Sequence, residues 1–248
     1  MTIRELKEKL MGEDVHDVSS AAELVRILRS EEGCPWDREQ DHHSIRTEFI
    51  EETYEAVEAI DREDSGLLRE ELGDVLFQVL FHTEIEREAG RFTLDDVTTE
   101  LVNKMIYRHP HVFGDVRVAG SGEVLDNWDR LKTAEKSRDT LYEVLDAVPK
   151  QYPALLRAKK IAKKARKGGA DFGSEEEQAA ALLSLAEDVN RTEGGERDRT
   201  IARLIWQAVR MASPDADLEK DVGDLLNGYV DSFRQDPEAP EDKKGDLA

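Results

Sequence analysis

Two long helical patterns joined by a short polar turn constrain the fold of this chain more than any other sequence feature. The first covers about residues 44–61 and the second about residues 67–89, with the turn "DREDSG" between them. Helices joined by so short a turn pack antiparallel, side by side. The residues predicted to face inward are Phe49, Thr53, Ala56, Val57 and Ile60 in the first helix, and Leu68, Leu72, Val75, Leu76, Val79 and Leu80 in the second.

Helix signals continue along the chain, and no long strand-like alternation is present, so we predict an all-α fold. Ser20 with Glu23 forms a capping-box pattern, and Gly33 is expected to end that helix in the left-handed conformation. Pro35 then predicts an ordered loop over "GCPWDREQDHH". Thr93, supported by Asp96, is expected to cap a further helix that stops before Pro110.

Composition excludes several classes of protein. The 248 residues carry a net charge of -21, which argues against a surface for nucleic acid. Such acidity suits cation binding, a salt-rich cytoplasm or general solubility. Cys34 is the only cysteine, so no intramolecular disulfide can form. The charged N-terminal stretch and the lack of a long apolar run predict a cytoplasmic protein without a membrane segment.

Carboxylates lie on both helices of the predicted hairpin. Glu52 and Glu55 share one helix face, and Glu71 and Asp74 share a face of the next helix. Packed together, these side chains would repel unless a cation lay between them, and an all-oxygen cluster suits Mg²⁺ or Mn²⁺ rather than zinc. The alternative for the first helix is a solvated acidic face, made by Glu48, Glu51, Glu52, Glu55 and Glu58.

Four segments, in this order and spacing, resemble the MazG nucleoside triphosphate pyrophosphohydrolases over about residues 20–137. They are "GCPWDREQ", "EETYEAVEAI", "ELGDVLFQVLFH" and "KMIYRHPHVFGD". The resemblance implies an all-α fold in which two subunits pair their helices, hence a homodimer. It also implies Mg²⁺-dependent cleavage of an NTP or dNTP substrate to the monophosphate and pyrophosphate.

The family motifs fall on specific residues of this sequence. The resemblance implies Glu52, Glu55, Glu71 and Asp74 as metal ligands. Glu51 or Glu52 would accept the proton of the attacking water, and the sequence leaves that choice open. The implied phosphate-binding side chains are Lys104 and Arg108 on the fourth helix, with Lys132 further along the chain.

Two aromatic or polar elements around these motifs have competing interpretations. Trp36 could stack on a nucleobase and Asp37 could accept its hydrogen bonds, but Trp36 could equally fill a corner of the domain. His109 and His111 bracket Pro110, where a capping or hydrogen-bonding role is favoured over catalysis.

The second half of the chain resembles a degenerate copy of the first. We divide the chain into a catalytic domain at residues 15–115, a helical linker at 116–150, a second MazG-like domain at 151–235 and a disordered tail at 236–248. In the second copy, Thr200 and Arg203 stand where Glu71 and Asp74 should be. In place of Glu51, Glu52 and Glu55 it has Ala186, Glu187 and Asn190. The basic segment before these residues, Lys159 to Lys167, fits either a solvated face or an anion site.

These observations predict an Mg²⁺-dependent nucleoside triphosphate pyrophosphohydrolase that is active through its N-terminal half. The alternative is a regulatory protein that senses nucleotides without turnover. All four expected carboxylates are present, which favours the enzyme, because a sensor would not need the complete set.

Overall fold

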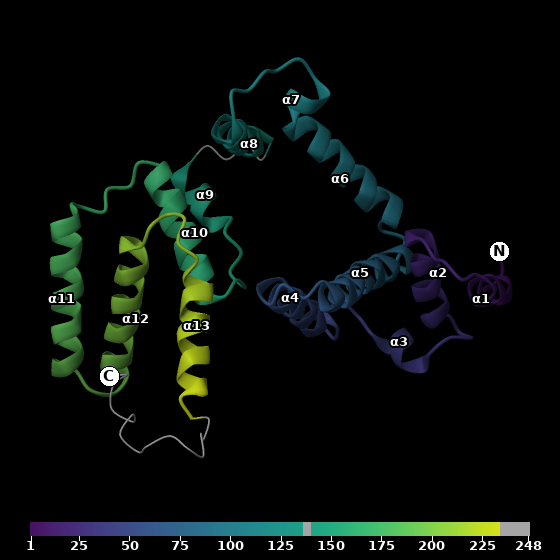
Figure 1. The fold of residues 1–248 in the computed structure, drawn as a ribbon, viewed down its shortest axis with the longest axis horizontal. Coiled ribbons are helices and arrows are strands. Elements are labelled where there is room, and N and C mark those ends of the chain that lie inside the picture. The colour runs from purple at the N-terminus through teal and green to yellow at the C-terminus, as the bar shows by residue number, and fades with distance from the viewer. Residues whose placement is uncertain (136–139, 234–248) are drawn as a thin grey trace. The chain divides into compact units, whose positions relative to one another are not determined.

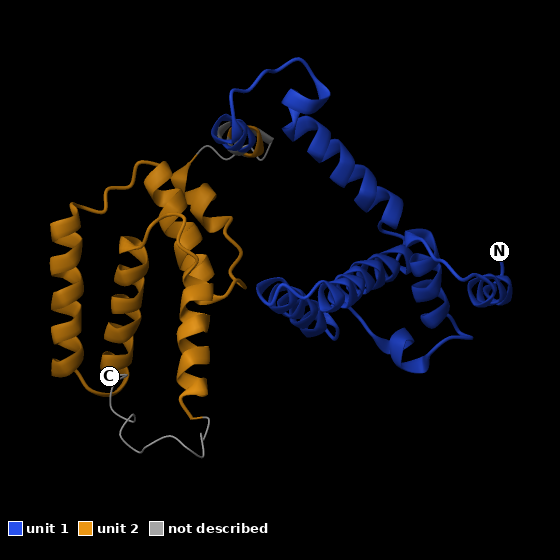
Figure 2. Cartoon of the chain, in the orientation of Figure 1, with its two compact units in different colours: residues 1–129 blue, residues 130–248 orange. Residues whose placement is uncertain are grey.

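The structure, a computed structural model, describes residues 1–135 and 140–233, and its regular elements there are all helices (Figure 1). The all-α prediction is therefore confirmed. The chain divides into two compact units, residues 1–129 and residues 130–248 (Figure 2). The division falls within the segment that the sequence assigned to a linker. The predicted disordered tail at 236–248 lies outside the described residues.

The first unit contains the predicted hairpin and the helices around it. The helices are α1 (Ile3–Gly12), α2 (Val18–Leu28), α3 (Pro35–Glu39), α4 (Arg46–Asp61), α5 (Ser65–Glu88), α6 (Leu94–Arg108), α7 (Pro110–Phe113) and α8 (Ser121–Glu135), which extends past the division. The sequence did not predict α1, α3 or α7.

The second unit contains α9 (Leu141–Asp146), α10 (Ala154–Lys167), α11 (Glu175–Arg191), α12 (Gly194–Met211) and α13 (Leu218–Asp231). Its long helices fall within residues 151–235, the segment expected to be the second MazG-like domain. The basic segment is α10, and α11 and α12 form a second helical hairpin through contacts along their lengths.

The α4–α5 hairpin has well-defined ends. Asp64 caps α5 by accepting hydrogen bonds from the backbone N–H groups of Gly66 and Leu67, each at 3.0 Å. Gly90 ends α5 with a φ of 68°, a conformation that costs glycine little. Thr93 and Asp96 form the expected capping box at the start of α6. The cap at Thr93 is therefore confirmed, whereas Asp64 was not predicted as a cap.

Two other local predictions were wrong. Ser20 lies inside α2, because Asp17 caps that helix and accepts a hydrogen bond from the Ser20 N–H at 2.9 Å. Gly33 is not left-handed but lies against backbone: a Cβ there would meet the Ile27 carbonyl oxygen at 2.1 Å. The loop predicted after Gly33 contains the short helix α3, which begins at Pro35, where a missing N–H costs nothing.

The core of the first unit lies where α2, the segment before α4 and the second half of α5 meet. Val25, Ile45, Leu80 and Phe81 form it, each almost fully buried. Ala56 and Ala59 are buried on α4 and allow α5 to approach closely. The hairpin is therefore fixed to the core mainly through the C-terminal half of α5.

Several residues predicted to face inward are exposed in the single chain. On α5, Leu72 is 55% exposed and Leu76 is 37% exposed, and Val57 and Ile60 on α4 are also exposed. Apolar periodicity located an apolar helix face correctly, but no described residue of the first unit covers it. This half of the hairpin presents apolar side chains to its surroundings.

Burial along α12 repeats the burial along α5. With Glu71 aligned to Thr200, the buried pair Gln78 and Gln207 falls in register, as does the buried pair Leu80 and Val209. The exposed Leu72 and Leu76 align with the exposed Ile201 and Ile205. The two helices therefore present equivalent faces, but the carboxylates of α5 are missing from α12.

Candidate metal centre

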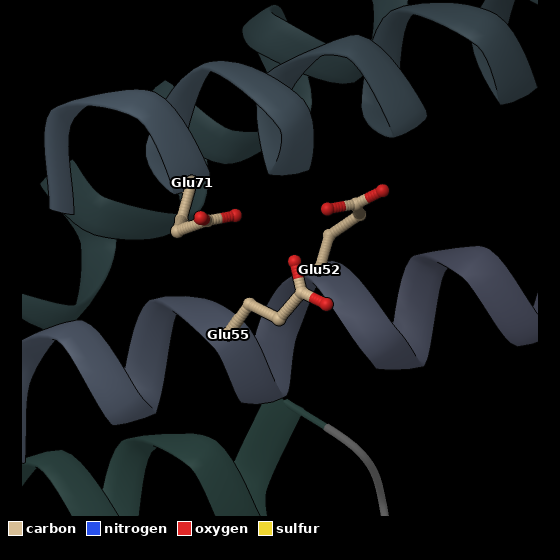
Figure 3. Close-up of side chains that lie close together, drawn as sticks. All are labelled: Glu52, Glu55 and Glu71. Carbon is tan, nitrogen blue, oxygen red and sulfur yellow. The ribbon is translucent and has the colours of Figure 1, made fainter. Parts of the chain in front are cut away.

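Three glutamates converge between α4 and α5 (Figure 3). Glu52 and Glu55, one turn apart on α4, point toward Glu71 on α5, and each offers an oxygen within 4.8 Å of the other two. Glu71 is buried and Glu52 is half-buried, whereas Glu55 is exposed. Of these three residues, only Glu55 fits the interpretation as a solvated acidic face. Glu52 and Glu71 do not fit it.

The electrostatics of this group favour a cation. Burial raises the pKa of Glu52, and the negative charges of Asp74, Glu55 and Glu51 raise it further. Burial is also the first cause of the raised pKa of Glu71, followed by its acidic neighbours. Raised pKa values show that these negative charges lack compensation from the protein itself. A divalent cation bound among them would supply it.

Asp74 and Glu51 lie at the edge of the group. Asp74 is exposed on α5 and acts on Glu52 and Glu71 through its charge, without joining the three oxygens within 4.8 Å. Glu51 is exposed on α4 beside Glu52. The ligand atoms on offer are all carboxylate oxygens, the donors that Mg²⁺ and Mn²⁺ prefer. The residues present therefore fit such an ion.

Comparison with known proteins identifies the family. Residues 40–113 match the model of the MazG nucleotide pyrophosphohydrolase domain, a range that contains the converging glutamates. Over 211 residues the chain is 37% identical to the nucleoside triphosphate pyrophosphohydrolase of Escherichia coli K12, covering 85% of this chain and 74% of that protein. The chain belongs to the MazG nucleotide pyrophosphohydrolase family.

Other relatives differ in how much of their length this chain represents. The Thermotoga maritima protein named nucleoside triphosphate pyrophosphohydrolase/pyrophosphatase MazG is 37% identical over 223 residues, 88% of this chain and 78% of its own length. The uncharacterized protein YabN of Bacillus subtilis is 48% identical over 157 residues, 63% of this chain. This chain spans only 31% of YabN.

The Trp36–Asp37 pair lies on α3, which Arg29 holds in place through hydrogen bonds to backbone carbonyl oxygens. The buried Arg29 donates hydrogen bonds to the Asp37 carbonyl oxygen at 2.7 Å and the Gln40 carbonyl oxygen at 3.0 Å, and it pairs with Glu88 at 2.8 Å. Asp37 is buried, whereas Trp36 is 59% exposed. An indole this exposed does not fill a corner of the single chain.

Two of the basic residues matched to the MazG pattern lie apart from the carboxylates of the first unit. Helix α6 begins next to α5 and extends away from the α4–α5 pair, so its second half, with Lys104 and Arg108, lies apart from them (Figure 1). Arg108 is buried, and its guanidinium lies 5.3 Å from the centre of the Trp128 ring. Lys132 is half-buried on α8, in the second unit.

His109 has the capping role that the sequence favoured. Its Nδ1 lies 2.6 Å from the Met105 carbonyl oxygen in the last turn of α6, and its ring lies near that of His111. His109 therefore ends α6 and precedes α7, and His111 lies within α7.

Among the described residues, no helix combines the length and the apolar character needed to cross a membrane.

Sequence reasoning missed a polar network beside the hairpin. The Nδ1 atoms of His42 and His82 are 2.8 Å apart, and His42 Nε2 lies 2.5 Å from Glu86 Oε1. Hydrogen bonds from Arg91 and then from His42 lower the pKa of Glu86 to about 2. Nothing in the sequence links His42 with His82, which are forty positions apart and meet only because α5 passes the start of α4.

Proposed function

We propose that the first unit hydrolyses nucleoside triphosphates, NTP or dNTP, to the monophosphate and pyrophosphate, with Mg²⁺ as cofactor and Mn²⁺ as a substitute. The observation that carries the proposal is the convergence of Glu52, Glu55 and Glu71, inside the segment that matches the MazG domain. The E. coli and T. maritima relatives are named for this activity, which supports the same reaction class.

The chain's own residues hold the metal and move the proton. Glu52, Glu55 and Glu71 bind the ion, with Asp74 completing the set from one turn further along α5. When bound, Mg²⁺ neutralises phosphate oxygens and lowers the pKa of a coordinated water. Either Glu51 or Glu52 accepts the proton of the attacking water, and we favour Glu51 because it lies outside the three converging oxygens.

A homodimer completes the site in this proposal. The exposed apolar face of α4 and α5, including Val57, Leu72 and Leu76, is the surface that a second subunit would cover. Since α6 extends away from the carboxylates of its own chain, we expect Lys104 and Arg108 to reach the phosphates of a substrate bound mainly by the other subunit. Trp36 and Asp37 contact the nucleobase, and Lys132 contributes to phosphate binding.

The second unit is proposed to be a non-catalytic MazG-like repeat. Thr200 and Arg203 replace the carboxylates of α5, and Arg203 places a cation where the ion would bind. Counting from the hairpin turns, Leu182 and Leu185 of α11 match Glu52 and Glu55 of α4 better than Ala186, Glu187 and Asn190 do. Either alignment leaves this hairpin without the four carboxylates.

The test is product analysis with the purified full-length chain, Mg²⁺ and a panel of ordinary and damaged NTPs and dNTPs. We expect NMP and pyrophosphate as primary products, and a loss of more than about 100-fold in turnover for Asp74→Asn. Glu58→Gln, on the exposed surface of α4, is the matched control and should retain activity. Orthophosphate and NDP as primary products, or nucleotide binding without turnover, would refute the proposal.

A further inference from the structure

Two buried oxygens beside the carboxylate group accept no hydrogen bond from any described residue. They are Glu48 Oε2 on α4 and Gln78 Oε1 on α5. Gln78 is only 8% exposed, so water does not reach this oxygen freely. Buried acceptors are nearly always paired, because an unpaired one keeps the cost of its desolvation. Each of these oxygens therefore needs a donor or a cation.

The register of the α4–α5 hairpin places the two side chains opposite each other. Glu55 meets Glu71 across the interface. In antiparallel helices, seven positions back along α4 correspond to seven positions forward along α5. The step from Glu55 and Glu71 therefore leads to Glu48 and Gln78.

A ring contact lies close to these two side chains. Phe49 follows Glu48 on α4, His82 lies one turn beyond Gln78 on α5, and the centres of the two rings are 5.5 Å apart. On α5, Gln78 therefore lies between the carboxylates and an aromatic contact with α4. Glu48 and Gln78 extend the line of acceptor oxygens by one helical turn along the same interface.

In the second unit, both polar side-chain atoms of the equivalent glutamine have hydrogen-bond partners. Gln207 aligns with Gln78 and is equally buried, and its Nε2 donates to the Gln178 carbonyl oxygen at 3.0 Å. Its Oε1 accepts a hydrogen bond from the cationic Arg210 at 3.2 Å. Arg210 aligns with Phe81, which has no donor to offer. In the first unit, Arg29 lies 5.0 Å from the centre of the Phe81 ring, but the hydrogen bond that the glutamine oxygen accepts in the second unit is missing.

We propose that Glu48 Oε2 and Gln78 Oε1 are ligands of a second divalent cation, bound one helical turn from the group of Glu52, Glu55 and Glu71. Glu52, one turn from Glu48 and already in that group, lies between the two ions. A single divalent ion leaves excess negative charge among Glu48, Glu51, Glu52, Glu55, Glu71 and Asp74, and a second ion reduces this excess. The inference rests on the proposed metal-dependent hydrolysis, since it adds an ion to that site.

Magnesium and manganese fit the second position as they fit the first. A carboxylate and an amide oxygen are hard donors, and a partly hydrated ion takes its remaining ligands from water or substrate phosphate. A pair of ions at such a site clamps the attacking and leaving oxygens of a displacement at phosphorus. Phosphate esters and anhydrides are thus the substrates for which the second ion would matter.

The competing arrangement is a direct hydrogen bond, in which the Gln78 amide turns so that its Nε2 donates to Glu48. It makes an opposite prediction for Gln78→Glu. A carboxylate at position 78 strengthens a cation site, whereas it cannot donate to Glu48 and would set two negative charges against each other. This substitution separates the two arrangements.

The experiment is Mn²⁺ titration of the purified full-length chain, followed by electron paramagnetic resonance, with thermal unfolding to confirm that each variant folds. We expect two Mn²⁺ ions per chain with a spin-coupled signal, which isolated adventitious surface sites do not give. Glu48→Gln should weaken the second ion by about 10-fold or more and remove the coupling. Gln78→Glu should keep or strengthen it, and Glu58→Gln, the control on α4, should behave as wild type.

The outcomes distinguish this inference from the proposed function. One uncoupled ion in the wild-type chain, or coupling that survives Glu48→Gln, would overturn the second site and leave metal-dependent hydrolysis in place. Loss of the coupled signal in Gln78→Glu would also overturn it and support the hydrogen-bonded pair. Failure to bind any Mn²⁺ in the hairpin would contradict the proposed function as well.

Discussion

The carboxylates of Glu52 and Glu71 face each other across the α4–α5 interface, where each has an oxygen within 4.8 Å of the other. Both pKa values are raised, first by burial and then by acidic neighbours. The hairpin therefore holds like charges together that would separate if it opened. The repulsion destabilises the metal-free chain, and the same carboxylates provide oxygens that can bind a cation.

Replacing Glu71 by glutamine tests both the destabilisation of the metal-free chain and the binding of a cation. We expect Glu71→Gln to raise the melting temperature of the metal-free chain at neutral pH, because it removes one of the repelling charges without changing side-chain size. The same change should abolish stabilisation by Mg²⁺ and reduce turnover by more than about 100-fold. Calorimetry with and without Mg²⁺ measures the first two effects. Unchanged Mg²⁺ stabilisation would remove Glu71 from the ligand set.

The raised pKa values also predict a pH dependence with a definite sign. A carboxyl group with a raised pKa in the folded state binds more protons there than when unfolded, so folding is favoured below its unfolded pKa. As pH rises through the raised pKa values of Glu52 and Glu71, this contribution is lost. Comparison of wild type with Glu71→Gln isolates the effect. Without metal, the free energy of unfolding of Glu71→Gln should exceed that of wild type by an amount that grows with rising pH. This difference should shrink when Mg²⁺ is added. A constant difference would contradict it.

The Glu86 network predicts the opposite behaviour in acid. The pKa of Glu86 is lowered from 4.5 to about 2, mainly by Arg91 and then by His42, so its contribution is present above pH 4.5 and is lost as the pH falls toward 2. Arg91→Gln should bring the pKa of Glu86, measured by carbon-13 NMR, back toward 4.5. Arg62→Gln, at an exposed pair with Glu58, is the control and should leave that pKa unchanged.

The sequence predicted the long helices and the converging glutamates because both follow from spacing within one helix. The carboxylate pairs of α4 and α5 needed only the helical repeat and a short turn to be brought together. By contrast, Ser20 was wrongly assigned as a cap, since Asp17, three residues earlier, competes for the same role. Local patterns fail where two acceptors can cap one helix.

Features that depend on register between helices were beyond the sequence. Glu48 and Gln78 carry no motif, and their relation appears only when α4 and α5 are aligned in space. The exposure of Leu72 and Leu76 has a related cause, because an apolar face indicates that something covers it without indicating which chain does so. The sequence predicted an apolar face here and expected it to face inward, whereas Leu72 and Leu76 are exposed in the first unit.

The exposed face of α5 leads to a prediction about assembly. We expect the intact chain to be a homodimer in multi-angle light scattering, and we expect Leu72→Lys to shift it toward monomer, since a charge would be buried in the interface. Val15→Lys, at a residue that is 85% exposed, is the control and should leave the dimer intact. A wild-type chain that is monomeric and fully active would show that the site needs no second subunit.

Trp36 yields a prediction about substrate binding. If its exposed indole stacks on the nucleobase, Trp36→Ala should raise KM by about 10-fold, the equivalent of a stacking free energy of about 1.4 kcal/mol, with little change in kcat. Trp36→Phe retains an aromatic face and should recover most of the loss. Equal kinetics for the alanine variant and wild type would assign the indole another role, such as packing against a second subunit.

We expect only the first of the two units to hydrolyse nucleotides. Thr200 is buried where Glu71 is buried, but a hydroxyl cannot replace the negative charge, and the Thr200 hydroxyl already donates to the Glu196 carbonyl oxygen at 3.0 Å. Arg203 adds a positive charge at the position of Asp74. The second hairpin should therefore neither bind Mg²⁺ nor hydrolyse nucleotides.

Two fragments of the chain test this division. We expect residues 1–137 to retain hydrolysis, because they contain every proposed ligand together with Lys104, Arg108 and Lys132, and we expect residues 138–248 to show none. Circular dichroism should confirm that both fragments are helical, so that inactivity of the second is not a failure to fold. The double substitution Thr200→Glu and Arg203→Asp restores two of the four carboxylates and should still give no turnover, since Leu182 and Leu185 face it from α11. Hydrolysis by the second fragment would overturn the assignment of activity to the first unit.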